Sequence, residues 1–296
     1  MPTMFEPPPR LKQGSRVAVV APSGPVPEER MLASLAWLRE RYDVWLPGSL
    51  FDREGYLAGI DEVRAEALSA AMLDPKTRAI VCARGGYGAG RIVGALPWEK
   101  FAAQPKWIVG YSDVTVLHAE CTRLGVASLH ADNAGTLARA SAAEQLAWLR
   151  ALEHGEMDPW QKLYALRAGD VEGTLVGGNL SLLVAQAAAG RLVWPADAIV
   201  VIEDVGEKPY RVDRMLNALR DRLSVCRAVV FGQFSDCNAN ADGVTVADVL
   251  SDFANRVSVP VYGGAPFGHC VNNAPILLGA YARLIGGTLS CGVGGA

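Results

Sequence analysis

The clearest candidate for a chemically active side chain is Ser112, which follows a short apolar run and precedes a predicted helix. The serine lies two residues after Gly110, at the point where a buried strand over 107–109 is expected to end. A sharp strand-turn-helix of this kind can expose a serine hydroxyl as a nucleophile. The sequence also allows a structural role, in which Ser112 or Asp113 caps the helix predicted over 114–124.

A serine nucleophile needs a base, and the sequence contains four histidines. His118 lies in the predicted helix behind the serine and is expected to point away from it. His154 ends a charged helix and is expected to lie on the surface. His130 follows a predicted strand, whereas His269 lies in a loop directly after a glycine. Both of these remain candidates for a general base.

A carboxylate that orients the base would complete a catalytic triad. Glu203 directly follows the apolar run 198–202, so a predicted strand should hold it rigidly and bury it in part. The alternative for Glu203 is a salt bridge to Arg211 or Arg214.

A cluster of glycines, Arg84-Gly-Gly-Tyr-Gly88, follows a third predicted strand. It does not fit the dinucleotide motif GxGxxG, and no Lys-Ser/Thr pair follows it as in a phosphate-binding loop. Its backbone N–H groups could still bind an anion or an oxyanion, or the segment could be only a tight turn. We therefore expect no nucleotide cofactor.

The segments that must position these residues alternate between strand and helix patterns. Short apolar strands alternating with helices predict an α/β fold, with an N-terminal doubly wound, mostly parallel sheet domain. In the first half we expect strands over 16–20, 44–46, 79–83, 107–109 and 125–129, and helices over 27–42, 61–72, 114–124 and 141–154. Asp61 and Ser141 are expected to be the N-caps of the second and fourth of these helices.

The pattern loses its periodicity over 155–168 and then resumes. In the second half we expect strands over 171–178, 198–203, 228–231 and 284–293, and helices over 179–189, 210–223 and 244–254. The sequence thus predicts two domains: residues 1–155 carry the serine, and residues 168–296 form a smaller α/β domain.

The composition excludes several classes of protein. The chain has 296 residues, of which 50% are hydrophobic and 20% charged, with a net charge of −3. These values are ordinary for a globular protein and unlike those of a nucleic-acid binder. We expect no membrane span, no secretory signal and no metal site. The six cysteines form no CxxC pair and are expected to be free thiols of a reduced cytoplasmic protein.

Several blocks of sequence, taken together, resemble the LD-carboxypeptidases, the muramoyl-tetrapeptide carboxypeptidase family of serine peptidases. The family also includes the microcin-type self-immunity peptidases. The resemblance spans about 20 to 280 and includes Ala83-Arg-Gly-Gly-Tyr-Gly88, Ile108-Val-Gly-Tyr-Ser-Asp113, Gly177-Gly-Asn-Leu180, Glu203-Asp-Val-Gly-Glu-Lys-Pro-Tyr-Arg211 and Phe267-Gly-His269.

The resemblance implies a role for each candidate residue. Ser112 would be the nucleophile, His269 the general base and Glu203 the acid that orients it. The backbone N–H groups of Gly86 and Asp113 would form the oxyanion hole. The N-terminal domain would carry the serine and the C-terminal domain the other two groups, so the site would lie between them.

The function implied is the release of the terminal D-alanine from murein tetrapeptides during cell-wall recycling, without a metal or cofactor. The family also implies a homodimer. One alternative is a self-immunity peptidase that cleaves a peptide-nucleotide antibiotic with the same triad. The other is a non-catalytic two-domain ligand-binding protein, in which Ser112 only caps a helix.

Overall fold

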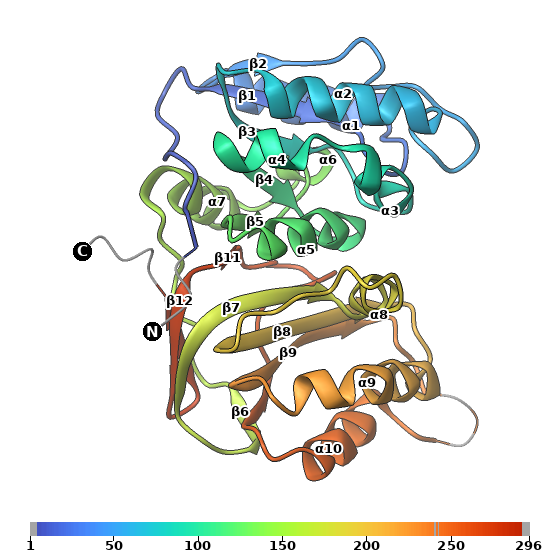
Figure 1. Cartoon of the computed structure of the whole chain (residues 1–296), viewed down its shortest axis with the longest axis vertical. Helices are drawn as coiled ribbons and strands as arrows, with labels where there is room; N and C mark the ends of the chain where they lie inside the picture. The colour runs from blue at the N-terminus through green and yellow to red at the C-terminus, as the bar shows by residue number, and fades with distance from the viewer. Residues whose placement is uncertain (1–4, 240, 242, 292–296) are drawn as a thin grey trace.

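The computed structural model describes residues 5–239, 241 and 243–291. The chain forms two α/β halves, one above the other in Figure 1, each built on its own sheet. The first sheet has the strand order β11-β5-β4-β3-β1-β2, and the second has the order β13-β12-β7-β8-β9-β10-β6. No helix within the described residues is long and apolar enough to cross a membrane.

The first sheet is parallel except at one edge. Its parallel strands are β1 (Arg16–Val20), β2 (Asp43–Trp45), β3 (Thr77–Cys82), β4 (Trp107–Gly110) and β5 (Ser128–His130). The side chains of successive β1 residues belong to different hydrophobic clusters, one on each face of the sheet. Val17 and Val19 belong to one cluster, and Ala18 and Val20 belong to the other.

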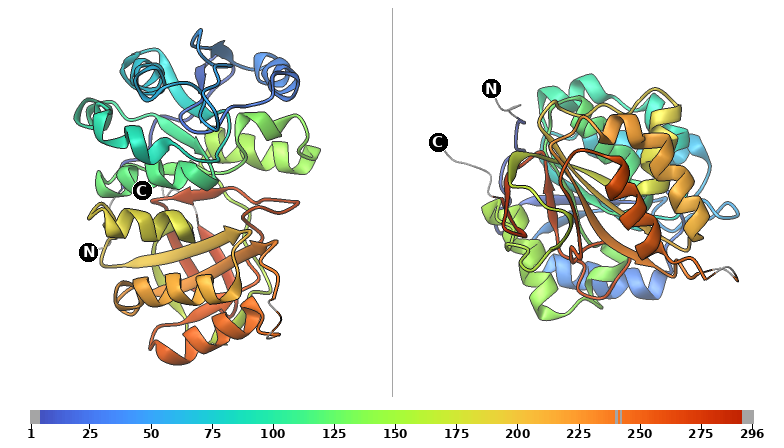
Figure 2. Two further views of the ribbon diagram at one scale, coloured as in Figure 1. Left: turned by 90° about the vertical axis from the view of Figure 1, so that its right-hand side faces the viewer. Right: turned by 90° about the horizontal axis from the view of Figure 1, so that it is seen from below.

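Helices cover both faces of this sheet, which confirms the predicted doubly wound fold (Figure 2). One face carries α1 (Glu28–Arg39), α6 (Ala134–Leu137) and α7 (Ala142–His154). The other face carries α2 (Asp61–Leu73), α3 (Ala89–Ile92), α4 (Trp98–Ala103) and α5 (Thr115–Arg123).

The second sheet has a parallel centre with antiparallel edges. The centre consists of β7 (Val171–Asn179), β8 (Ala198–Val205), β9 (Ala228–Ser235) and β10 (Val261–Gly263). The edges are β6 (Tyr164–Arg167), β12 (Tyr281–Ile285) and β13 (Thr288–Cys291). One face packs against α8 (Leu180–Ala188), α9 (Pro209–Leu223) and α10 (Val246–Arg256).

Some elements differ from the sequence expectation. Strand β6 lies inside the segment 155–168, which was predicted to be an irregular connector. The strand expected over 284–293 is instead a hairpin of β12 and β13, and positions 292 and 293 lie outside the described residues. Strand β11 (Ile276–Leu278), which the sequence did not indicate, pairs antiparallel with β5 and completes the first sheet.

The helix starts show how well capping can be predicted. Ser141 caps α7 as expected: its hydroxyl accepts from the backbone N–H of Glu144, whose carboxylate accepts from that of Ser141. Asp61 is not the predicted N-cap of α2, since Ile60 holds that position and the Asp61 carboxylate binds Arg64 instead. All six cysteines are free; Cys82, Cys121 and Cys226 are buried, and Cys237, Cys270 and Cys291 are partly exposed.

Candidate active site

Ser112 occupies a strained turn between β4 and α5. It opens a single 3-10 turn, η2 (Ser112–Val114), with a backbone φ of 67°. This left-handed conformation is unfavourable for a residue with a side chain, and such strain clusters at functional sites. Gly85 lies directly against the serine: a Cβ at Gly85 would be 2.7 Å from the Cβ of Ser112. The turn therefore depends on glycine at position 85.

The two residues predicted as alternative caps of the following helix do not cap it. Val114 is the N-cap residue of α5 and makes no side-chain capping bond. The buried carboxylate of Asp113 instead accepts from the backbone N–H of Ala89, 2.8 Å away at the start of α3. The capping interpretation of Ser112 and Asp113 is therefore wrong. Asp113 instead joins the serine turn to the start of α3.

Two buried side chains hold the backbone just before Ser112. The Nε2 of His118 lies 2.8 Å from the carbonyl oxygen of Gly110, and its Nδ1 lies 2.9 Å from the hydroxyl of Ser128. Since a carbonyl can only accept, Nε2 carries the proton and Nδ1 accepts from Ser128. Asn133 Oδ1 accepts from the backbone N–H of Tyr111 at 3.3 Å. His118 thus supports the turn from behind, a contact that the sequence did not indicate.

The glycine-rich loop 84–88 is fixed by a buried arginine. Arg64 is 2% exposed and donates to the carbonyl oxygens of Gly88 at 3.0 Å and Gly59 at 3.2 Å, and also to that of Pro22. The carbonyl of Gly85 accepts from Gly24 at 3.0 Å. These bonds join three loops and hold the backbone next to Ser112 in one position.

Glu203 and His269 form a direct pair at the end of β8. The Nδ1 of His269 lies 2.8 Å from Oε2 of Glu203, whose side chain is fully buried, whereas the histidine is one-fifth exposed. An ionised carboxylate accepts, so Nδ1 donates and Nε2 is left free. Gly268 packs against Glu203, because a Cβ at Gly268 would lie 3.0 Å from Oε2. The salt bridge to Arg211 considered for Glu203 does not form, as Arg211 contacts Glu207.

His130, the other candidate base, is enclosed in the protein. Its ring is fully buried beside Phe267 and Tyr111, and neither ring nitrogen has a hydrogen-bond partner among the described residues. Burial lowers the pKa of His130 to about 3. The ring does not line the cavity that contains Ser112. The geometry therefore favours His269 over His130 as the general base.

Ser112 and His269 line the same cavity, of about 500 Å³, which also includes Gly85, Gly86 and Tyr111. Most of its walls come from the first half of the chain, and Val205 and His269 come from the second. The ring centroids of Tyr111 and His269 are 4.9 Å apart. The cavity thus lies where the two halves meet, with a hydroxyl, an imidazole and glycine backbone on its surface.

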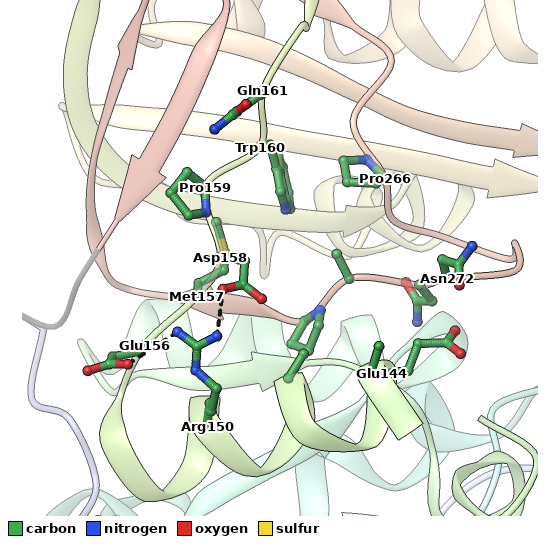
Figure 3. Close-up of a pocket in the computed structure, with 15 residues that line it drawn as sticks. Glu144, Arg150, Glu156, Met157, Asp158, Pro159, Trp160, Gln161, Pro266 and Asn272 are labelled. Atoms are coloured by element: carbon green, nitrogen blue, oxygen red, sulfur yellow. Dashed lines mark hydrogen bonds and ion pairs between the residues drawn. The ribbon is translucent and has the colours of Figure 1, made fainter. Parts of the chain in front are cut away.

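A second cavity, of about 280 Å³, lies between α7 and the loop that leads from β10 to β11 (Figure 3). Arg150 reaches from α7 to Asp158, with 2.7 Å between Nη1 and Oδ1. Trp160 and Pro266 form an apolar wall above this ion pair. None of Ser112, Glu203 and His269 lines this second cavity.

The described residues contain no group of three or more His, Cys, Asp or Glu side chains that could hold a metal ion. The first cavity carries the hydroxyl of Ser112 and the imidazole of His269, which is paired with the carboxylate of Glu203.

Comparison with known families gives two matches along the chain. Residues 17–131 match the model of the LD-carboxypeptidase N-terminal domain. Residues 172–284 match the model of the LD-carboxypeptidase C-terminal domain. The two matches cover more than half of the sequence and fall on the two halves of the fold.

Individual relatives and solved structures agree with these matches. A putative carboxypeptidase of Synechocystis is 38% identical, with 98% of both chains covered. The murein tetrapeptide carboxypeptidase of Pseudomonas aeruginosa is 33% identical over 93% of this chain and 94% of its own. The crystal structure of muramoyltetrapeptide carboxypeptidase from Oxalobacter formigenes is 30% identical, with a TM-score of 0.85, and covers 94% of this chain and 98% of its own. The microcin C7 self-immunity protein MccF shares the fold at 17% identity, with a TM-score of 0.85 and 98% of both chains covered.

Proposed function

The chain belongs to the LD-carboxypeptidase family, and from that premise we propose that it is a serine carboxypeptidase that releases the terminal D-alanine from murein tetrapeptides. The observation that carries the proposal is the hydrogen bond between buried Glu203 and His269, whose ring lines one cavity with the strained Ser112. The relatives with murein substrates in their names support the choice of substrate.

The proposed reaction is an acyl transfer in two steps. His269 takes the proton of Ser112 through the free Nε2, and the serine oxygen attacks the scissile carbonyl carbon. Two backbone N–H groups, those of Gly86 and Asp113, stabilise the oxyanion. His269 then protonates the departing amine of D-alanine, and water releases the tripeptide from the serine.

Glu203 has a positioning and electrostatic role in this scheme. Its buried carboxylate accepts from Nδ1 of His269, which fixes the tautomer that leaves Nε2 basic. It also stabilises the imidazolium that forms when His269 takes the proton. Since β8 carries the acid near its C-terminal end and the β10–β11 loop carries the base, the second half of the chain supplies both groups.

The murein reaction is favoured over the self-immunity reaction because the likeness to MccF is one of fold alone. A non-catalytic binding protein is disfavoured because Ser112 does not cap α5. On the family resemblance we further propose a homodimer that acts in cell-wall recycling, and on the free cysteines a cytoplasmic location. Light scattering after size exclusion would measure the mass of the assembly.

Product analysis tests the proposed function. The protein is incubated with a murein tetrapeptide, and the products are separated and identified by mass spectrometry. We expect a tripeptide and free D-alanine in equal amounts from the wild type and neither from the Ser112→Ala variant. Intact tetrapeptide after prolonged incubation with the wild type would contradict the proposal.

A further inference from the structure

The cavity that contains Ser112 carries positive charge that the proposed chemistry does not use. Arg30, from the first turn of α1, and Arg84, from the loop after β3, both line it. No Asp or Glu is among the described residues that line this cavity. Neither arginine forms an ion pair with a carboxylate in the part of the chain that the structure describes. The two guanidinium groups therefore retain capacity for an anionic ligand.

Arg84 is held in place by an uncharged partner. Its Nη1 donates to the carbonyl oxygen of Pro25 at 2.8 Å, which fixes one edge of the guanidinium group. The Nε and Nη2 atoms of Arg84 make no hydrogen bond with the described residues. A guanidinium group has five N–H donors in a rigid fork, so the remaining donors can receive a planar carboxylate.

The position of Arg84 in the chain suits the substrate of a carboxypeptidase. In a peptide that ends in D-alanine, the free carboxylate is three bonds from the scissile carbonyl carbon. A group that binds it must therefore lie close to the nucleophile. Arg84 directly precedes Gly85, which packs against Ser112, and both arginines share the cavity with His269.

We propose that Arg30 and Arg84 bind the free α-carboxylate of the terminal residue and so restrict the enzyme to the end of its peptide. The proposal rests on the proposed function and adds the group that recognises the chain end. Arg211, by contrast, lies outside the cavity and contacts Glu207.

Binding to an inactive enzyme tests this assignment without turnover. In a Ser112→Ala background, calorimetry measures the affinity for a murein tetrapeptide and for the same peptide ending in D-alaninamide. We expect the peptide with the free carboxylate to bind roughly 10- to 100-fold more tightly than the amide, which is the range for a hydrogen-bonded charge pair. Arg30→Gln and Arg84→Gln should each reduce this preference, and the double variant should abolish it while binding of the amide is unchanged.

Arg256→Gln is the matched control, because Arg256 is an exposed arginine on α10 paired with Asp252. This variant should keep the full preference for the carboxylate. A preference that survives in the Arg30/Arg84 double variant overturns the proposal, and so does equal weakening of both peptides. If the Ser112→Ala protein binds neither peptide and the wild type releases no D-alanine, the proposed function itself has failed.

Discussion

The hydroxyl oxygen of Thr115 accepts a hydrogen bond from the backbone N–H of Asn179, 3.0 Å away, and so joins the two halves of the protein. Thr115 begins α5, three residues after Ser112, and Asn179 is the register partner of Glu203 in the neighbouring strand. Gly178 allows this approach, because a Cβ there would lie 2.6 Å from the Thr115 hydroxyl. One bond thus links the segment that carries the proposed nucleophile to the strands that carry its acid.

This link predicts a loss of activity when Thr115 is replaced by valine. Valine keeps the shape but leaves the buried N–H of Asn179 without an acceptor, which costs about 1–3 kcal/mol. A small displacement of Ser112 from His269 should lower kcat by roughly 10- to 100-fold, with little change in KM. Thr115→Ser retains the oxygen and should stay close to the wild type. Equal kcat values for the valine and serine variants would contradict the positioning role.

Glu203→Gln tests the acid of the proposed triad. Glutamine keeps the shape but can stabilise the wrong imidazole tautomer, and the equivalent amide substitution in chymotrypsin-type proteases lowers kcat about 10⁴-fold. We expect a folded enzyme whose kcat falls by roughly 10²- to 10⁴-fold, with little change in KM. Since Glu203 contacts His269 and Arg211 contacts Glu207, no salt bridge to Arg211 is lost. A lower Tm with normal turnover would remove Glu203 from the site.

Gly85→Ala tests the close packing behind the serine. The new Cβ would lie 2.7 Å from the Cβ of Ser112, so the serine turn must shift. We expect kcat to fall by roughly 100-fold, as for other small displacements of reacting groups. Gly90→Ala is the control, because no atom lies within 4 Å of a Cβ there and the residue is helical. Similar activity in the two variants would contradict the steric argument.

His130→Leu separates the buried histidine from the proposed base. We expect this variant to retain most activity, whereas His269→Ala should lose about as much as Ser112→Ala, since triad members act as a unit. The reverse pattern would make His130 the base. Steady-state kinetics on the three variants decide between the two histidines.

The His130→Leu variant should also change how the stability of the protein depends on pH. Burial lowers the pKa of His130 from 6.5 to about 3, so between these values the unfolded chain binds more protons at this ring than the folded protein. The stability associated with the neutral ring is therefore lost as pH falls below 6.5. His130→Leu should show a shallower decline of Tm below pH 6.5 than the wild type. The exposed His154→Leu is the control, and identical slopes for all three proteins would contradict the prediction.

The sequence predicted the longer helices and strands better than the contacts between them. Strands such as β1 and β8 show continuous apolar runs, and the Ser141–Glu144 pair marks the start of α7. Strand β11 could not be found in this way, because a three-residue strand is defined by pairing with β5, far away in the sequence.

The alternatives for the site differ in contacts that the sequence does not show. The sequence alone left Ser112 as a nucleophile or a cap and left two histidines as bases. Periodicity cannot show that Asp113 binds the start of α3 or that His118 contacts the carbonyl of Gly110, since both contacts depend on how loops and helices pack. The burial of His130 likewise depends on Phe267, which is distant in the chain.

Labelling with a fluorophosphonate probe measures the activation of Ser112 most directly. The probe phosphonylates a serine whose hydroxyl is made nucleophilic by a base, and mass spectrometry of the digested protein locates the adduct. We predict one adduct per chain, on Ser112 of the wild type, and at least a hundredfold slower labelling in His269→Ala, of the order of triad losses. An unlabelled wild type, or equal labelling rates in the two proteins, would contradict the account.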